Sequence, residues 1–146
     1  MRDALISIKP RYTKDIISGK KTVELRSRIV NLDPGTTLWI YSTLPEGHLN
    51  IAAKVQMIDV DSPKNIWKRY STSIGIDKNE YDNYVFGKSI VSAICMTSVI
   101  KIEPSVSLHE LRQIQEGFQP PQFFKKLYPD DPLLRHLFAL RQSQML

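Results

Sequence analysis

The sequence predicts an α+β protein, a small, mixed, partly closed β-barrel with short flanking helices and a helical C-terminus. About five or six β-favouring segments are separated by short helical ones, and the first helical segment lies between the first two strands. Strict βαβα alternation is absent. The chain has 146 residues, 42% of them hydrophobic, which suits one domain with a real core. We expect a single domain over 1–146, with a core at about 4–104 and a C-terminal helical region at 105–146.

The first elements are predicted by their patterns and end signals. Residues 3–8 form an apolar strand. Pro10 suits the first turn of a helix, where its missing N–H is not needed, and Gly19 supplies the stop. Residues 21–26 alternate strictly, so one face of this strand is apolar and the other carries charged side chains.

The later elements follow from the same kinds of signal. Apolar, β-branched runs predict strands, and capping residues or prolines predict helix starts. The expected strands are 37–43, 50–60 and 88–102; the expected helices start at Ser62-Pro63, Asp77, Ser107 and Asp131-Pro132.

The positive charge is concentrated at one end of the chain. The formal net charge is +5, and residues 1–28 account for all of it, because the rest of the chain carries equal numbers of bases and acids. A basic surface attracts polyanions, most commonly nucleic acid. The alternative is that these lysines and arginines only solvate an exposed helix and turn.

Several function classes have no support in the sequence. The glycine-rich dinucleotide and phosphate loops and the G-x-S-x-G serine motif are missing. The one cysteine, Cys95, lies in an apolar strand, where a thiol is expected to be buried and inert. The three histidines lie far apart, and no apolar run approaches the ~20 residues that span a bilayer. We expect a cytoplasmic protein with no metal, no cofactor and no membrane partner; monomer and dimer both stay open.

Two segments near the N-terminus resemble the opening of the ASCH domain family. Residues 5–10 read LISIKP, and residues 16–26 read IISGKKTVELR, which resembles a helix closing on a glycine followed by K-T-x-E-x-R on a strand. Ser62-Pro63 leading to Trp67, and the Pro-Pro-Gln-Phe segment at 120–123, resemble later parts of the family. The resemblance covers about residues 4–127.

This resemblance implies a PUA-like β-barrel that holds RNA or a nucleotide in a cleft beside the first helix. It implies an RNA-binding protein that acts as a transcriptional regulator, and modified nucleotides are among the ligands it implies. The alternative it implies is an enzyme in the same cleft, either an amidohydrolase of N4-acetylcytidine or a ribonuclease. In the amidohydrolases a lysine acts with a threonine three residues further on. Lys21 falls on that lysine, but Glu24 stands at the threonine position and has no hydroxyl to activate.

Lys9, Lys21, Glu24 and Arg26 form the predicted site, because the end of the first strand and the charged face of the second can converge where the first helix stops. A carboxylate between two bases would orient them toward a phosphate or a base edge. As catalytic groups, Lys21 would be a base of depressed pKa and Glu24 an acid-base group. The alternative is an idle ion pair on the barrel surface, worth about 0.2 to 1 kcal/mol.

Tyr41 and Ser42 complete the predicted binding residues. Tyr41, expected on the face opposite Trp39, is the candidate for stacking on a base, and Ser42 beside it could donate a hydrogen bond. Lys54 lies among apolar neighbours and is either a base in the cleft or, as we favour, a lysine that snorkels at the barrel rim. The apolar C-terminal helix could alternatively pair with a partner protein, although such a stripe more often packs on its own domain.

Overall fold

Six strands and five helices make up the structure, a computed structural model that describes residues 2–144. The first half of the chain contains β1 (Asp3–Ile8), α1 (Pro10–Ser18), β2 (Val23–Arg26), β3 (Thr37–Ser42), β4 (His48–Asp61) and α2 (Pro63–Tyr70). The second half contains α3 (Lys78–Val85), β5 (Val91–Ser107), α4 (Leu108–Ile114), β6 (Phe124–Leu127) and α5 (Pro132–Gln144).

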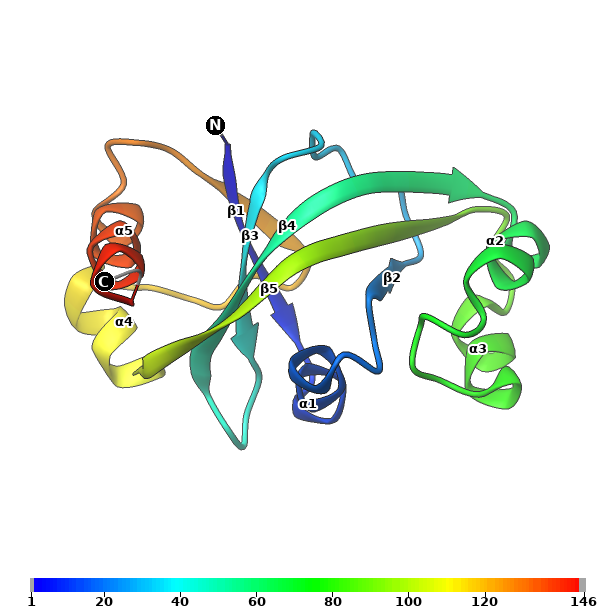
Figure 1. Ribbon diagram of the computed structural model, residues 1–146, viewed down its shortest axis with the longest axis horizontal. Coiled ribbons are helices and arrows are strands. Elements are labelled where there is room, and N and C mark those ends of the chain that lie inside the picture. The colour runs from blue at the N-terminus through cyan, green and yellow to red at the C-terminus, as the bar shows by residue number, and fades with distance from the viewer. Residues whose placement is uncertain (1, 145–146) are drawn as a thin grey trace.

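All six strands belong to one curled sheet. Their order is β2-β5-β4-β3-β1-β6; β1 and β3 run parallel, and the other neighbours run antiparallel. β4 and β5 are long, and their register shifts at Leu49/Ile51, Ala52/Lys54 and Val55/Met57. Such bulges bend and twist a strand pair. Both strands accordingly sweep across the whole molecule in Figure 1, and the sheet closes partway into a barrel. The predicted mixed, partly closed barrel is confirmed.

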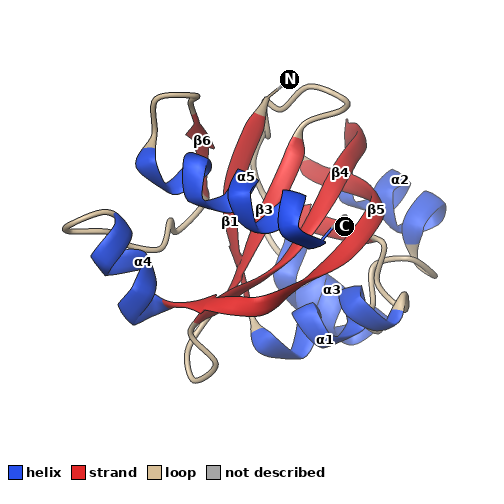
Figure 2. Cartoon of the chain, turned by 60° about the vertical axis from the view of Figure 1, so that its left-hand side comes forward, coloured by secondary structure: helices blue, strands red, loops and turns tan. Residues whose placement is uncertain are grey.

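The helices cover the sheet at its two ends. α4 and α5 lie at one end and α2 and α3 at the other, with α1 below the middle of the sheet (Figure 1). Seen from the side, α5 crosses one face of the sheet (Figure 2). Its buried leucines, Leu133, Leu134 and Leu137, pack in one cluster with Leu5 and Trp39. These three leucines of the helix are therefore covered by its own domain, whereas Phe138 is exposed.

The predicted helix starts are confirmed, and each has a local cause. Pro10 opens α1, and the side chains of Ser62 and Asp77 accept the backbone N–H groups that cap α2 and α3. Ser107 and Glu110 form a reciprocal capping box at α4. These signals act within a few residues, which is why the sequence alone reveals them.

The C-terminal region departs from the prediction. It is not only helical, because β6 pairs with β1 at the sheet edge, from Asp3↔Leu127 to Ile6↔Phe124. Near the expected boundary at about residue 104, β5 continues to Ser107. A four-residue strand is fixed by its partner across the sheet rather than by its own sequence.

Candidate functional site

The backbone around α1 brings three segments to one place. β1 ends at Ile8, and Lys9 stands directly before the helix as its N-cap residue. Gly19 ends the helix with φ 85°, a left-handed conformation that glycine adopts without strain. The Lys21 N–H then donates to the Asp15 carbonyl (3.0 Å), which turns the chain into β2. The end of β1, the start of α1 and β2 thus surround a common space.

That space is a cleft of about 500 Å³. It lies between these three segments, the loop before β6 and the region of α3. It is lined by charged residues (Lys9, Lys21, Glu24, Arg26), polar ones (Ser7, Thr43, Gln122) and apolar or aromatic ones (Ile8, Tyr12, Leu25, Ile76, Tyr84, Pro120, Pro121).

A buried charged array forms part of the cleft wall. Glu24 is the centre: its Oε1 lies 3.2 Å from Lys21 Nζ, and its Oε2 accepts from Arg26 Nη2 at 2.9 Å. The Lys21 residue is 3% exposed and the Glu24 residue 7% exposed. Lys21 Nζ also donates to the Ile74 carbonyl at 2.7 Å. The array is therefore buried, in contrast to the surface pair of the alternative interpretation.

Two polar atoms of this wall have unused hydrogen-bonding capacity. Ser7 Oγ and Arg26 Nε are buried, and neither has a hydrogen-bond partner among the side chains described for residues 2–141 or their backbone. The same arginine is held in place by Nη2, which donates to the Ser7 carbonyl at 2.9 Å. Buried polar groups are almost always paired, and leaving one unpaired costs about 1–3 kcal/mol. A hydrogen-bond partner for either atom would recover that cost.

Aromatic side chains flank the charged array. The Tyr12 ring centroid lies 5.2 Å from Lys21 Nζ, and the Tyr84 hydroxyl donates to the Leu25 carbonyl at 3.1 Å. Burial, and next the negative charge of Glu24, raise the pKa of Tyr84, so this phenol is neutral at physiological pH. Arg11 and Lys21 both lie over the Tyr12 ring, so Tyr84, with Pro120 and Pro121, is the aromatic residue of the lining that is left for a planar group to contact.

The structure brings together four of the six predicted site residues. Lys9, Lys21, Glu24 and Arg26 all line the cleft. Sequence reasoning did not single out Ser7 or Tyr12 as part of it, and it named Tyr84 only as one of several aromatic residues that could stack on a base. For Ser7 a signal exists, because it is a polar residue in an otherwise apolar stretch of strand; the tyrosines carry no comparable signal.

Tyr41 and Ser42 do not line the cleft. Tyr41 is 2% exposed and packs in the same cluster as Trp39, so its expected place on the opposite face is wrong. Residues two apart on a strand share a face. Ser42 is fully buried, 2.9 Å from Thr13 Oγ1, and its hydroxyl donates to Glu46. Both serve the packing behind β3 rather than a ligand.

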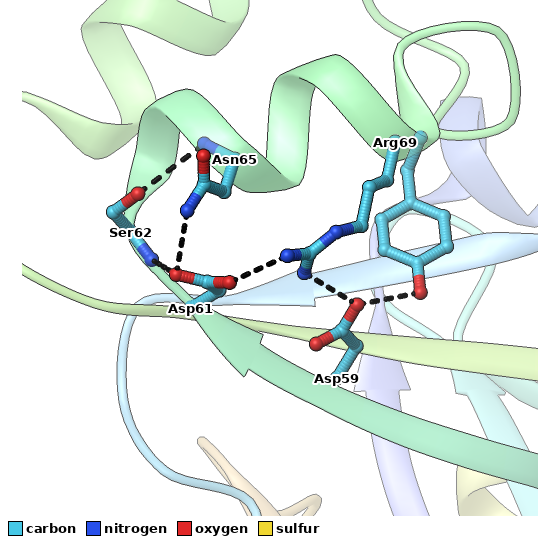
Figure 3. Close-up of polar contacts among 6 residues, drawn as sticks. Asp59, Asp61, Ser62, Asn65 and Arg69 are labelled. Carbon is cyan, nitrogen blue, oxygen red and sulfur yellow. Dashed lines mark hydrogen bonds and ion pairs between the residues drawn. The ribbon is translucent and has the colours of Figure 1, made fainter.

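A second charged cluster joins the end of β4 to α2 (Figure 3). Arg69 donates from Nη1 to Asp59 (2.9 Å) and from Nη2 to Asp61 (2.7 Å). Asp61 also accepts from the Ser62 N–H and from the Asn65 amide. These bonds, led by that of Ser62, lower the pKa of the Asp61 carboxyl from 3.8 to about 2. We call these residues the β4–α2 cluster.

The structure gives no support to a reactive thiol, a metal site or a membrane-spanning helix within the part of the chain that it describes. Cys95 is buried as expected, and burial raises the pKa of its thiol. Across residues 2–144, no group of three or more His, Cys, Asp and Glu side chains could hold a metal ion. Nor does this part of the chain contain a helix of the length and hydrophobicity needed to cross a membrane.

The fold and the cleft define a class of protein: a small mixed half-barrel with a charged cleft where its first helix ends. Comparison with known proteins narrows this class. A family model described as "Domain of unknown function (DUF365)" matches residues 5–123. An "ASCH domain-containing ribonuclease" of Zymomonas mobilis subsp. mobilis is 33% identical over 121 residues, which is 83% of this chain and 81% of that one.

Solved structures agree with the sequence matches. The crystal structure of ASCH from Zymomonas mobilis superposes with a TM-score of 0.88 at 30% identity, covering 94% of this chain and 94% of that one. A tyrosine-to-phenylalanine mutant of ZmASCH gives 0.89 at 29% identity, covering 96% and 99%. The chain belongs to the ASCH domain family.

Proposed function

We propose that the protein binds single-stranded RNA, with one nucleotide inside the cleft. The observation that carries the proposal is the buried array of Lys21, Glu24 and Arg26 beside the unpaired Ser7 Oγ and Arg26 Nε. The cleft volume of about 500 Å³ falls within the range of ~300–1,000 Å³ that is typical of small-ligand sites. It accepts a nucleotide splayed from its neighbours, and it is too small for a duplex.

The charges around the cleft suit a polyanion. Lys9 is exposed and lines the cleft, and Lys14 and Lys20 are exposed on α1 and just beyond its end. Each lysine that neutralises a phosphate releases counterions, so these residues favour a nucleic-acid strand over a neutral ligand. The basic excess of residues 1–28 would then follow the strand on both sides of the bound nucleotide.

The cleft walls suit a base. Single-stranded RNA is recognised by stacking of splayed bases on aromatic side chains and by hydrogen bonds to base edges. Tyr84 supplies a ring, while Arg26 Nε supplies a donor and Ser7 Oγ a group that both donates and accepts. The ribonuclease name of the Zymomonas relative supports RNA as the ligand.

A second candidate function is cleavage of the bound RNA, which the same relative and Glu24 favour. Glu24 is the one carboxylate among the residues that line the cleft. As general base it would take the proton of a ribose 2′-hydroxyl, whose oxygen attacks the adjacent phosphorus as the bond to O5′ breaks. The products are a 2′,3′-cyclic phosphate and a 5′-hydroxyl, which takes its proton from water. Lys21 and Arg26 would stabilise the charge that develops on the phosphate.

The amidohydrolase alternative is less favoured than cleavage. The glutamate at position 24 offers no hydroxyl nucleophile for the neighbouring Lys21 amine to activate. A regulatory role would correspond to binding without turnover, and a modified nucleotide would be read by the same base contacts.

One experiment tests binding and cleavage together. End-labelled single-stranded RNA is incubated with the protein, with magnesium or with a chelator, and followed by gel shift and by separation of products; N4-acetylcytidine is run in parallel. We expect a complex that weakens as salt rises. Cleavage requires products that disappear in Glu24→Gln while that variant still binds.

The matched control is Arg69→Gln, which removes an arginine–carboxylate contact from the β4–α2 cluster outside the cleft. It should bind and cleave as the unmodified protein does. Absence of any salt-sensitive complex with RNA overturns the binding proposal, and an equal loss of binding in Arg69→Gln and Arg26→Gln would place the effect outside the cleft.

A further inference from the structure

Another, smaller pocket lies at the other end of β3. Thr43, just past β3, lines the cleft, whereas Thr37, its first residue, lines this pocket. Six residues of extended strand separate them, roughly 20 Å. The pocket has a volume of about 180 Å³, and its other lining residues come from β4 (Ala52, Ala53, Lys54), β5 (Ser98, Ile100) and the last turn of α5 (Arg141). It is therefore distinct from the cleft.

Two cations meet at one buried hydroxyl in this pocket. Lys54 Nζ donates to Thr37 Oγ1 at 2.7 Å, and Arg141 Nη1 lies 3.4 Å from the same oxygen. The Thr37 residue is 3% exposed. Among residues 2–141, whose side chains the structure describes, neither cation forms an ion pair with a carboxylate. The cleft role considered for Lys54 is thus wrong, since its amine points into this pocket.

The charges of Lys54 and Arg141 are poorly compensated. Burial, and next the positive charge of Arg141, lower the pKa of Lys54. Asp3 acts on Lys54 in the opposite sense, but its Oδ1 already accepts the indole N–H of Trp39 at 3.0 Å. Two cations thus face one carboxylate that is already engaged elsewhere, which leaves a net positive site.

The backbone is irregular at two places next to the pocket, at Ser98 in β5 and beside Lys54 in β4. Ser98 has φ 52°, and it is the one non-glycine residue with positive φ in the described part of the chain. Such a conformation is uncommon, and it clusters at functional sites. On the facing strand, the β4–β5 register shifts between Ala52 and Lys54. Bulges of this kind redirect side chains.

We propose that this pocket binds a phosphate group. A tetrahedral oxyanion offers enough acceptor oxygens for Lys54, Arg141 and the hydroxyl of Ser98 at once, and charge-assisted bonds of this kind are the strong ones. The volume admits a phosphate and excludes an attached base, which would extend into solvent. The group could be inorganic phosphate or the phosphate at an RNA end, and the chemistry of recognition is the same for both.

Titration with inorganic phosphate at constant ionic strength, followed by amide NMR, tests the site. We expect saturable shifts at Thr37, Lys54 and Ser98, with no such response to acetate. Lys54→Met and Arg141→Gln should each weaken binding about tenfold or more. Lys88→Met, an exposed lysine that does not line the pocket, should bind as the unmodified protein does.

Two competitors identify the source of the phosphate. If a short 5′-phosphorylated RNA displaces the bound phosphate and its 5′-hydroxyl counterpart does not, the ligand of the site is the phosphate at an RNA end. If neither RNA displaces it, the ligand is free phosphate. If Lys54→Met fails to fold, Arg141→Gln at the end of α5 decides. Absence of saturable shifts up to millimolar phosphate, or equal binding by all variants, overturns the proposal. Glu24→Gln should leave this binding unchanged, so failure here is separable from failure at the cleft.

Discussion

The molecule contains two charged clusters that look alike in composition and differ in how completely they are paired. In the β4–α2 cluster, the two terminal nitrogens of Arg69 each pair with an aspartate, and the arginine side chain is 45% exposed. In the cleft, Lys21 and Arg26 share one glutamate, the lysine side chain is 3% exposed, and Arg26 Nε has no partner. The first cluster is saturated and exposed to water; the second is buried and incomplete.

This difference separates a structural contact from a site prepared for a ligand. Exposed ion pairs contribute little to stability, and the β4–α2 cluster only attaches a short helix to the end of a strand. A buried ion pair requires costly desolvation, and hydrophobic residues in its place are often no less stable. The three buried charges and the unpaired Arg26 Nε therefore cost stability in the free protein. A ligand that bonds to them would offset that cost.

The largest expected effect distinguishes the two clusters by stability. Glu24→Ala leaves Lys21 and Arg26 buried without their carboxylate, so we expect the free energy of unfolding to fall by about 3–5 kcal/mol. Arg69→Ala exposes two aspartates to water that already reaches them, and should shift the urea midpoint far less. Urea unfolding followed by circular dichroism measures both, and similar losses for the two variants would remove the contrast.

Arg26→Lys tests recognition separately from charge. Lysine keeps the charge beside Glu24, but it has neither the Nε donor nor the planar fork of arginine. We expect the dissociation constant for single-stranded RNA to rise about tenfold, equivalent to about 1.4 kcal/mol. Stability should change by less than about 1 kcal/mol. Fluorescence anisotropy with labelled RNA gives the affinity, and unchanged binding would show that Arg26 contributes charge alone.

Lys9→Ala should change the salt dependence of binding more than its sequence preference. Each phosphate contact to a single strand contributes about 0.7 to the slope of log K against log salt. Removing Lys9 should therefore flatten that slope by about 0.7, whereas Lys88→Ala should leave it unchanged. Titrations at several salt concentrations measure it, and identical slopes for both variants would assign Lys9 no phosphate.

The smallest effect lies in the β4–α2 cluster and depends on pH. The folded pKa of Asp61 is about 2, below its ordinary 3.8. A carboxyl with a depressed folded pKa contributes stability that is fully present above its unfolded pKa and is lost as pH falls through the folded one. Between about pH 4 and 2, the unmodified protein should lose stability that Asp61→Asn has already lost. Urea midpoints across this window should converge at the acid end; parallel curves would contradict the assignment.

The parts of the structure that could be predicted are those with local causes. Pro10, Gly19, Ser62 and Ser107 mark helix ends through contacts a few residues away. β6 could not be predicted from local signals, because it is defined by its pairing with β1, a strand far away in the sequence. The lengths of β4 and β5 depend in the same way on each other.

The residues of the candidate site also differ in whether they could be predicted from nearby sequence. Lys9, Lys21, Glu24 and Arg26 are close in sequence, so one strand and one helix stop were enough to group them. Tyr84 reaches the cleft from the distant helix α3, and the sequence names it as a stacking candidate without separating it from the other aromatic residues. The predicted face for Tyr41 was wrong for a simpler reason. Strand alternation places residues two apart on the same face, so Tyr41 lies on the buried side with Trp39.

The wall formed by Pro120, Pro121 and Gln122 has a consequence for the order in which the protein is made. Chains are synthesised from the N-terminus, so the basic segment with Lys21 and Arg26 leaves the ribosome early. The opposite wall follows much later, together with β6, which fastens it to β1. Until then, the nascent chain presents these positive charges without the pocket that would select among ligands. Selective recognition can therefore begin only after residues 120–127 have been synthesised.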